Sequence, residues 1–524
     1  MKWLDKQEIT LGGWLVGSAG ILIIRFFFEA LSSHAATGII ATDLSTLVHY
    51  ALFYFGVAVS LLLILAFLDP KNKTRHPKLV LFGLPIIWLP PLVDLVLLGG
   101  MDMAYIFATP SELFTAWATF LGPLQEPGIT LGIRLEIFLV MIGTTIYLWQ
   151  SQKKILKALF GALLAYTAIF LWVSFPSVLG WITGFDPLVL FFDLPAQSIP
   201  LQNIFHPTMQ SIGSGRAQEL LFNVSISHLA AFTVFPLFLL YSWTCFRDTV
   251  RAIWRNKRGF RVIHYLIIGL VGILIGYQTN GIEISNFYDI SGVIFFALAI
   301  VFAWLFAVGV NDITDQKIDA VSNKERPLIT GKISIENMKE INKLFFLLLV
   351  LCGYLAGHHA LFAILMFTGA YYIYSAPPLR LKRIPIIQSL LIAFATIAVF
   401  TGGFFMLTES HLIDLVPLPI VLTLLLVFTL VANLKDLKDL EGDKKAGIST
   451  LPVMLGMERA QQLIGIFLAI SFVLIGWVFN LSLGLSLIFA ILSFIAVQRT
   501  PFDERRVFLL YFAYTAIATL LYLT

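Results

Sequence analysis

Apolar residues come in long runs along this chain, and short polar stretches separate the runs. About fifteen of the runs are close to the roughly 20 residues that an α-helix needs to cross the hydrocarbon core of a bilayer. The pattern therefore predicts an all-α, polytopic membrane protein. We place its spanning segments near residues 10–30, 46–68, 79–98, 131–149, 158–180, 222–245, 262–278, 287–310, 341–356, 359–376, 385–407, 415–433, 461–479, 481–497 and 506–523.

The composition agrees with this pattern. Hydrophobic residues make up 58% of the 524 residues and charged residues only 13%, with a mean hydropathy of +0.88. A soluble protein carries about 25% charged residues. We therefore expect an integral membrane protein with the lipid bilayer as a partner and with no nucleic-acid partner.

The positions of the basic residues predict an orientation. If the N-terminus is cytoplasmic, 32 of the 35 Lys and Arg fall in segments that the fifteen spans place on the cytoplasmic side. Such an excess in short cytoplasmic loops is the positive-inside rule. We expect a multi-pass protein of a prokaryotic cytoplasmic membrane, with the C-terminus on the outer side.

A basic stretch divides the predicted spans into six and nine. It covers residues 246–261, reads FRDTVRAIWRNKRGFR, and is expected to be a cytoplasmic linker. The predicted domains are a six-helix membrane domain (1–245) and a nine-helix domain (262–524). We find no fixed-period repeat of the kind that marks solenoid proteins.

Two matched acidic motifs lie at the cytoplasmic ends of predicted helices in the nine-helix domain. The first is NDITDQKID at 311–319, and the second is DLKDLEGD at 436–443. In each motif three aspartates are spaced i, i+3 and i+7, which places them on one face of a helix. They are Asp312, Asp315 and Asp319 in the first motif, and Asp436, Asp439 and Asp443 in the second, with Asn311 adding an amide oxygen.

Six clustered carboxylates repel one another unless cations hold them. Mg²⁺ suits this role, because it prefers oxygen ligands and is commonly bound by one or two carboxylates together with substrate phosphates. Two acidic faces opposite each other would hold a diphosphate through bridging Mg²⁺ and favour departure of pyrophosphate from an allylic carbon. The alternative is that each motif is an ordinary solvated helix end, but two matched motifs at corresponding ends favour the metal site.

Basic residues and one amide near the motifs could bind phosphate oxygens. Asn323, Lys324 and Arg326 follow the first motif, and Arg380, Lys382 and Arg383 follow Pro377 and Pro378 between two predicted helices. Arginine offers a forked pair of donors that fits phosphate. Some of these residues are equally explained as ordinary cytoplasmic charges, so Arg326 and Lys382 are the preferred candidates.

Residues 260–524 resemble the UbiA superfamily of intramembrane prenyltransferases. Three motifs carry the resemblance in this order: NDxxDxxxD, YSxPPLRLKR and KDxxDxEGDxxxGxxTLPVxxG, the last standing here as Lys435 through Gly456. The resemblance implies a helical bundle around a central cavity that opens sideways to lipid. It also implies Mg²⁺-dependent transfer from a polyprenyl diphosphate donor to an acceptor substrate.

Matching the motifs residue by residue assigns expected roles. The metal would be bound by Asp312, Asp315, Asp319, Asp436, Asp439 and Asp443, and the expected catalytic residues are Asp312, Asp315, Asp436, Asp439 and Lys382. Asn311, Lys324, Arg326, Tyr374 and Arg380 would bind substrate. The resemblance leaves the acceptor open, with an aromatic quinone precursor favoured and a lipid or sugar-phosphate acceptor as the alternative.

We recognise no family resemblance in residues 1–245. Their three cations outside the cytoplasmic segments are Arg25, Arg134 and Arg216, each with an acidic residue nearby. Ionisable groups in a bilayer usually face a bundle interior or a water-filled cavity. These groups are therefore either structural ion pairs or a polar site for an anionic or zwitterionic ligand, and a transport, scaffold or second-enzyme role stays open.

A transporter is the competing function for the whole chain. Transport sites are expected near the bilayer midplane, often at broken helices in repeated halves. The aspartates here lie at helix ends on one side, and the two halves differ. The enzyme interpretation is therefore preferred for 262–524.

Overall fold

The computed structural model describes residues 2–37, 43–99, 109–122, 130–187, 189–198, 214–280, 284, 286–408 and 413–523. In these residues every regular element is helical, so the predicted all-α class is confirmed. The chain divides into two compact units, Met1–Val250 and Arg251–Thr524. The division falls inside the basic stretch 246–261, where the structure has a helix, α13 (Arg247–Asn256).

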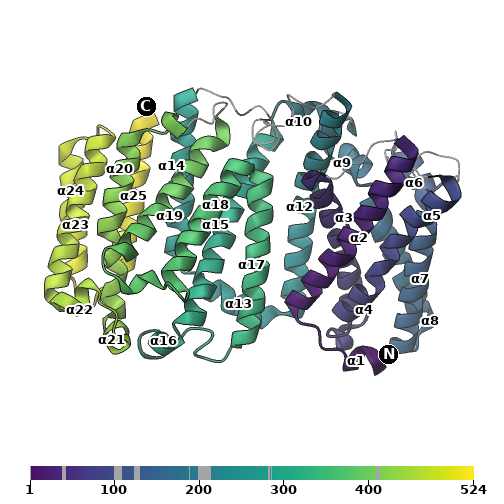
Figure 1. The fold of residues 1–524 in the computed structure, drawn as a ribbon, viewed down its shortest axis with the longest axis horizontal. Helices are drawn as coiled ribbons and strands as arrows, with labels where there is room; N and C mark the ends of the chain where they lie inside the picture. Colours follow the sequence, from purple (N-terminus) through teal and green to yellow (C-terminus); the bar gives the residue numbers. More distant parts are fainter. Residues whose placement is uncertain are drawn as a thin grey trace. The chain divides into compact units, whose positions relative to one another are not determined.

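The first unit is drawn in purple to teal in Figure 1. Its α-helices are α1 (Lys2–Lys6), α2 (Leu11–Thr37), α3 (Leu44–Leu68), α4 (His76–Gly83), α5 (Leu89–Leu98), α6 (Pro110–Ala118), α7 (Leu131–Gln152), α8 (Ile155–Val173), α9 (Phe175–Thr183), α10 (Leu194–Ala196) and α12 (Ser214–Cys245). Helix α3 packs against α8 and α12, and α7 packs against α8. Gly56 lets α3 approach α8 closely, because a Cβ at this position would lie 2.4 Å from the Trp172 ring.

Prolines break two of the predicted spans in this unit. The predicted segment 158–180 ends as a helix at Val173, and α9 begins at Phe175 with a proline in its first turn. The segment 79–98 is α4, a 3₁₀ turn (Leu84–Trp88) and α5, and prolines stand at the start of the turn and of α5. Proline has no N–H to donate and clashes with the preceding turn of an α-helix, which explains both interruptions.

Asp69 ties the end of α3 to α7 in the first unit. Its carboxylate accepts hydrogen bonds from Asn72 Nδ2 (2.8 Å), Tyr147 Oη (3.1 Å), Ser151 Oγ (2.6 Å) and Gln152 Nε2 (2.7 Å). Burial raises the pKa of Asp69, but these donors outweigh it and hold the pKa below its usual value. Hydrogen bonds to the charged form of a carboxylate have this effect.

Arg25, which is buried, and Arg134, which is partly buried, make contacts within the first unit. Arg25 pairs with Glu29 one turn later on α2, and its Nε donates to Tyr54 Oη at 3.1 Å. Arg134 donates to the backbone carbonyls of residues 120, 121 and 122 at 2.6, 3.2 and 2.8 Å. The side chain of Arg216 lies outside the described residues. Arg25 and Arg134 thus both contribute to packing, which favours the structural interpretation for these two.

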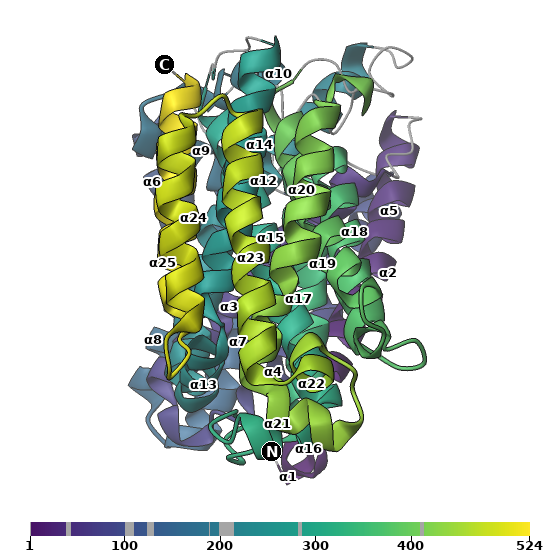
Figure 2. The ribbon, with the colours of Figure 1, turned by 90° about the vertical axis from the view of Figure 1, so that its left-hand side faces the viewer.

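The second unit is a bundle of long helices that run side by side (Figure 2). Its α-helices are the end of α13, α14 (Gly259–Asn280), α15 (Phe287–Thr314), α16 (Gln316–Ser322), α17 (Ile335–Ala356), α18 (His358–Ser375), α19 (Ile387–Phe404), α20 (Leu418–Val431), α21 (Asp436–Ala446), α22 (Leu451–Leu455), α23 (Met457–Val478), α24 (Leu483–Gln498) and α25 (Glu504–Leu523). The short helices α16, α21 and α22 all lie at one end of this bundle, opposite the C-terminus (Figure 1).

Glycines allow α14 and α19 to pack with their backbones in contact. A Cβ on Gly272 would lie 2.2 Å from the carbonyl oxygen of Phe400, and one on Gly276 would lie 2.2 Å from that of Phe404. In the opposite direction, a Cβ on Gly403 would lie 2.2 Å from the carbonyl oxygen of Gly269. Small residues at helix interfaces permit such close approach in membrane proteins. Helix α14 is thereby held firmly against the core of the bundle.

Each of the fifteen predicted spans corresponds to a helix or a helix group in the described residues. Eleven of them are long and apolar enough to cross a membrane by length and composition. The other four are α17, α18, α24 and α25, and α24 has only 16 residues. The chain is a multi-pass integral membrane protein.

Candidate functional site

The first acidic motif lies where α15 gives way to α16. Helix α15 ends at Thr314, Asp315 follows as its C-cap, and α16 begins at Gln316. Asn311 and Asp312 therefore occupy the last turn of a long buried helix, whereas Asp319 lies in the short helix after it. The first motif is therefore divided between two helices and does not lie on one continuous helix as its spacing predicts.

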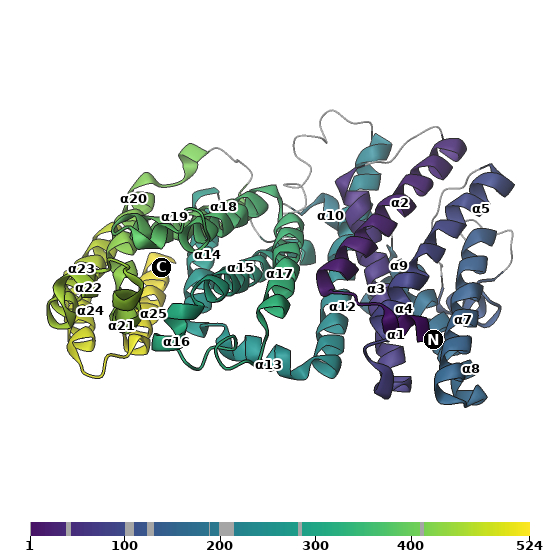
Figure 3. The same cartoon turned by 60° about the horizontal axis from the view of Figure 1, so that its bottom comes forward.

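The second motif also follows a break in a long helix, but it lies wholly in the helix after the break. Helix α20 ends at Val431, a 3₁₀ turn covers Ala432–Lys435, and α21 carries the three aspartates. Helices α16 and α21 pack against each other at the end of the bundle (Figure 3). Gly442 makes this possible, because a Cβ there would lie 2.3 Å from Ser322 Oγ and 2.8 Å from Ile318 Cγ2.

One polar cavity lies between the two motifs. It is lined by ten of the residues singled out from the sequence: Asn311, Asp315, Asp319, Asn323, Arg326, Tyr374, Lys382, Asp436, Asp439 and Asp443. Asp312, Lys324 and Arg380 do not line it. Asp312 and Arg380 lie directly behind lining residues, as described below, whereas Lys324 is exposed.

Asp312 is buried in a cluster of donors. It accepts hydrogen bonds from Asn256 Nδ2 (2.6 Å), Arg258 Nη2 (2.8 Å) and Arg326 Nη1 (2.6 Å). Two guanidinium groups therefore meet on one carboxylate. Burial and the neighbouring Arg326 lower the pKa of Arg258. The structure thus brings the turn after α13 into the wall of the cavity.

Asp315 is paired with the basic segment between α18 and α19. Lys382 Nζ and Arg380 Nη2 both contact its carboxylate, the latter at 2.7 Å, and all three side chains are at least four-fifths buried. Burial lowers the pKa of Lys382, and the charge of Asp315 opposes that shift. Arg380 has a backbone φ of +43°, in the left-handed region that residues other than glycine seldom adopt.

The second motif has its own cation and an amide link to the first motif. Lys435 Nζ lies 2.7 Å from Asp436 Oδ1 and 5.6 Å from the centre of the Tyr374 ring, and Gln388 Nε2 donates to Asp436 Oδ2 at 3.1 Å. Asn323 Nδ2 lies 2.9 Å from Asp319 Oδ1 and 3.3 Å from Asp439 Oδ1. Asn323 thus bridges the two motifs.

These oxygen ligands suit Mg²⁺ better than a softer metal. Among the described residues, no three His, Cys, Asp or Glu side chains are grouped closely enough to hold a metal ion by themselves. Mg²⁺ is commonly held by one or two carboxylates plus phosphate oxygens, so a site completed by a diphosphate needs no such group. Burial raises the pKa of Asp319 to about 6, as expected for a carboxylate that lacks a full counter-charge.

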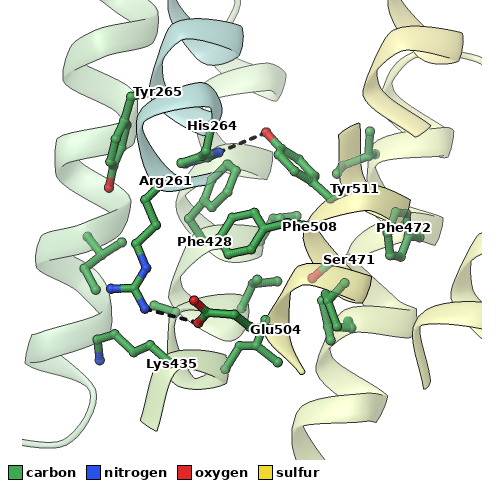
Figure 4. A pocket seen from close by; sticks show the side chains of 18 of the residues that line it. Arg261, His264, Tyr265, Phe428, Lys435, Ser471, Phe472, Glu504, Phe508 and Tyr511 are labelled. Atoms are coloured by element: carbon green, nitrogen blue, oxygen red, sulfur yellow. Dashed lines mark hydrogen bonds and ion pairs between the residues drawn. The ribbon is translucent and has the colours of Figure 1, made fainter. Parts of the chain in front are cut away.

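An apolar chamber adjoins the polar cavity, and Figure 4 shows it from close by. Arg261, Tyr371, Ile392 and Lys435 line both spaces. Beyond them the chamber wall is mostly aromatic and aliphatic, with Phe428, Phe472, Phe508 and Tyr511 among its residues. Its polar contacts include Arg261 Nη2 to Glu504 Oε2 at 3.3 Å and His264 Nδ1 to Tyr511 Oη at 3.1 Å.

Sequence reasoning missed several residues of this site. Asn256, Arg258 and Arg261 belong to the stretch 246–261, whose basic residues the positive-inside rule already explained, so nothing marked them as part of a site. Lys435 and Gln388 were also not identified. For Lys435 a signal existed, because it directly precedes the first aspartate of the second motif.

The second unit is similar to known proteins. The model of the UbiA prenyltransferase family matches residues 266–514. Homogentisate phytyltransferase 1 from Arabidopsis thaliana is 28% identical over 231 residues, which cover 41% of this chain and 56% of that protein. A digeranylgeranylglyceryl phosphate synthase from Methanococcoides burtonii is 30% identical over 214 residues, which cover 38% of this chain and 69% of that protein.

The matched regions differ in extent between relatives. This chain spans little more than half the length of the first two plant relatives, 56% and 57%. Among solved structures, a UbiA homologue from Archaeoglobus fulgidus, determined with GPP and Mg²⁺, aligns with a TM-score of 0.42 and 22% identity. That alignment covers 52% of this chain and 98% of the homologue.

Proposed function

This chain belongs to the UbiA prenyltransferase family, and from that membership we propose that residues 251–524 transfer a prenyl group from a prenyl diphosphate to an acceptor. One observation carries the proposal: a cavity lined by carboxylates and cations adjoins an apolar chamber and shares its wall residues. A prenyl diphosphate has the same division, with a charged head and a hydrocarbon tail. The head belongs in the polar cavity and the tail in the chamber.

The two acidic motifs are proposed to hold Mg²⁺ against the diphosphate. The ligands would come from Asp312, Asp315 and Asp319 in the first motif and from Asp436, Asp439 and Asp443 in the second. Bound Mg²⁺ supplies neutralisation of the diphosphate, which makes it a better leaving group. Lys382 and Arg326 add positive charge at the cavity wall, and Arg380 holds Asp315 from behind.

The reaction needs no nucleophile from the protein. The allylic C–O bond breaks, and its electron pair leaves with the diphosphate. The acceptor supplies the electrons for the new bond to the prenyl carbon and then loses a proton, which the released diphosphate or water accepts. Preorganised charges aimed at the departing group lower the barrier of such a step. Asn311 and Tyr374 line the same wall and would orient the donor's head.

An aromatic quinone precursor is the preferred acceptor class. Two relatives are named as homogentisate phytyltransferases, and the aromatic lining of the chamber can stack on a ring. A glycerol-phosphate lipid is the alternative, because other relatives are named digeranylgeranylglyceryl phosphate synthases. We further propose that the acidic motifs and the N-terminus lie on the cytoplasmic side, as the distribution of Lys and Arg predicts.

The test is a transfer assay on the full-length protein in lipid nanodiscs. Labelled geranyl, farnesyl and geranylgeranyl diphosphates are incubated with Mg²⁺ and with either homogentisate, 4-hydroxybenzoate or a geranylgeranylglyceryl phosphate. Asp315→Asn and Asp439→Asn are expected to abolish measurable product. Glu441→Gln is the matched control, because Glu441 lies on α21 between the motif aspartates but is exposed.

The outcomes separate the alternatives. Product from an aromatic acceptor alone supports the preferred class, and product from the glycerol-phosphate lipid alone selects the alternative. Pyrophosphate release that survives chelation of Mg²⁺, or that persists in both aspartate variants, contradicts the proposed function.

A further inference from the structure

The turn between α13 and α14 is built into the polar cavity. Trp304 Nε1 donates to the carbonyl oxygen of Lys257 at 2.9 Å, and Lys257 Nζ lies 3.0 Å from the centre of the Trp254 ring. Arg258 has a backbone φ of +52°, which a residue with a side chain seldom adopts without a local cause. These contacts aim the side chains of Asn256 and Arg258 at Asp312.

Two arginines share one oxygen of the Asp312 carboxylate. Arg258 and Arg326 both donate to Oδ1 of this one carboxylate, at 2.8 and 2.6 Å. Arg326 Nε also lies 4.0 Å from Asp319, whereas the only ion pair of Arg258 within the described residues is the one with Asp312. Asp312 would therefore keep Arg326 as a counter-charge if Arg258 moved to another anion.

Arg258 also has an unused donor. Its Nε is buried and has no hydrogen-bond partner within the described part of the chain. Arg380 repeats this arrangement: it has a left-handed backbone, one Nη2 on an aspartate of the first motif, and a buried Nε without a partner. Buried donors are normally satisfied, so each such donor indicates a ligand or a change of partner.

Arg258 and Asp312 differ in their access to the cavity. Arg258 and Arg326 line the cavity, whereas Asp312 lies behind them. An anion that enters the cavity therefore meets the guanidinium groups before it meets the carboxylate. A guanidinium group can hold two phosphate oxygens at once, which its single bond to Asp312 does not use.

We propose that Arg258 is a donor-binding residue that exchanges partners: it holds Asp312 while the cavity is empty and moves to the diphosphate when the donor binds. The exchange releases the Asp312 carboxylate for Mg²⁺ at the moment when the diphosphate arrives. The stretch that links the two units is thereby part of the site. This inference rests on the proposed function, since it assumes a diphosphate ligand.

The proposed exchange of partners has an experimental signature that differs from that of a local loss of structure. Without Arg258, Asp312 has one competitor fewer, so a metal ion alone should bind more tightly. The diphosphate loses a charged donor, so it should bind more weakly. Loss of local structure would instead weaken both.

The experiment measures two binding constants on the full-length protein. Mn²⁺ binding without diphosphate is followed by electron paramagnetic resonance, and binding of inorganic pyrophosphate at saturating Mg²⁺ by calorimetry. For Arg258→Gln we expect Mn²⁺ affinity to rise by about 3- to 10-fold and pyrophosphate affinity to fall by about 10- to 100-fold. Arg258→Lys should keep Mn²⁺ affinity near that of the wild type but bind pyrophosphate more weakly, because an ammonium group lacks the forked donors.

Arg255→Gln is the control, because Arg255 is an exposed arginine on the same helix α13. The proposal is overturned if both constants weaken together, if neither moves, or if Arg255→Gln reproduces the pattern. If Arg258→Gln does not fold, Arg258→Lys decides, and unchanged pyrophosphate affinity in that variant overturns the proposal. Failure of the proposed function looks different: the wild type binds Mn²⁺ and pyrophosphate but forms no prenylated product.

Discussion

Replacing Lys382 with methionine removes one buried positive charge and keeps much of the side chain's volume. Lys382 and Asp315 have side chains that are 8% and 7% exposed, and they contact each other at the edge of the polar cavity. The variant therefore tests how much of the activity depends on this ammonium group. It also leaves the backbone between α18 and α19 unchanged.

The cost in stability should be moderate. Stripping a buried carboxylate of its only partner costs about 3–5 kcal/mol. Asp315 keeps Arg380 at 2.7 Å, so it is not left without a counter-charge. The expected loss is that of one charged hydrogen bond, about 1.5–3 kcal/mol.

The loss of kcat should be larger than any decrease in the fraction of folded protein can explain. Removing one preorganised donor from a developing negative charge typically costs about 100- to 1,000-fold in kcat. Lys382 lines the cavity where the proposed diphosphate leaves, and bound Mg²⁺ cannot replace a charge at the same place. We expect kcat to fall by about 100-fold or more, with a smaller change in KM for the donor.

The assay pairs prenyl transfer with thermal unfolding of the same nanodisc preparation. Arg383→Met is the matched control, because Arg383 is the next residue and is exposed. It should retain wild-type kcat and melting temperature. A Lys382→Met variant within about threefold of wild-type kcat would refute the reasoning, and so would an equal loss in Arg383→Met.

Three further outcomes follow from packing and hydrogen bonding. Gly272→Ala should lower the stability of the second unit by about 1–3 kcal/mol, because its Cβ would meet the Phe400 carbonyl at 2.2 Å; Gly369→Ala, with open space around it, should not. Asp69→Asn should cost about 1.5–3 kcal/mol at pH 7. Because the pKa of Asp69 is lowered, its contribution is present above about pH 4 and is lost as the pH falls through the folded-state pKa, so wild type and variant should converge in acid melts. Arg134→Met should lower the melting temperature of the first unit without changing prenyl transfer per folded molecule, since Arg134 holds three backbone carbonyls; normal folding together with lost transfer would instead support a ligand site.

The helices were predictable from the sequence because each one is determined by its own segment of the chain. A segment in hydrocarbon must satisfy its own backbone hydrogen bonds, so an apolar run of sufficient length becomes a helix whatever its neighbours are. Prolines explain the predicted spans that are not continuous helices. The predicted segment 158–180 stops at Val173 because a proline lies in the next turn.

The composition of the candidate site was predictable only in part. The i, i+3, i+7 spacing brought six aspartates to attention, and five of them line one cavity. The roles assigned to them remain predictions. The partners of these aspartates were harder to predict from the sequence. Arg258 and Asp312 are 54 residues apart, and their contact depends on how α13, α14 and α15 pack.

Lys324 and Arg258 illustrate the difference between sequence proximity and spatial proximity. Lys324 follows the first motif closely in sequence, yet it is exposed and outside the cavity lining. Arg258 lies in a stretch whose charges were already explained by membrane topology, yet it contacts the first motif. Counting charges reports the side of the membrane on which a residue lies but not which residue it meets.

The short helix α24 has a consequence for the surrounding lipid. Its 16 residues span ~24 Å, whereas the hydrocarbon core of a typical bilayer is ~30 Å thick. It packs against α23, with 22 residues, and against α25, with 20. Local thinning of the bilayer beside α24 would accommodate this difference, and lipids with shorter acyl chains would then suit this edge of the second unit better. The acyl-chain length of the surrounding lipid is therefore expected to affect this protein.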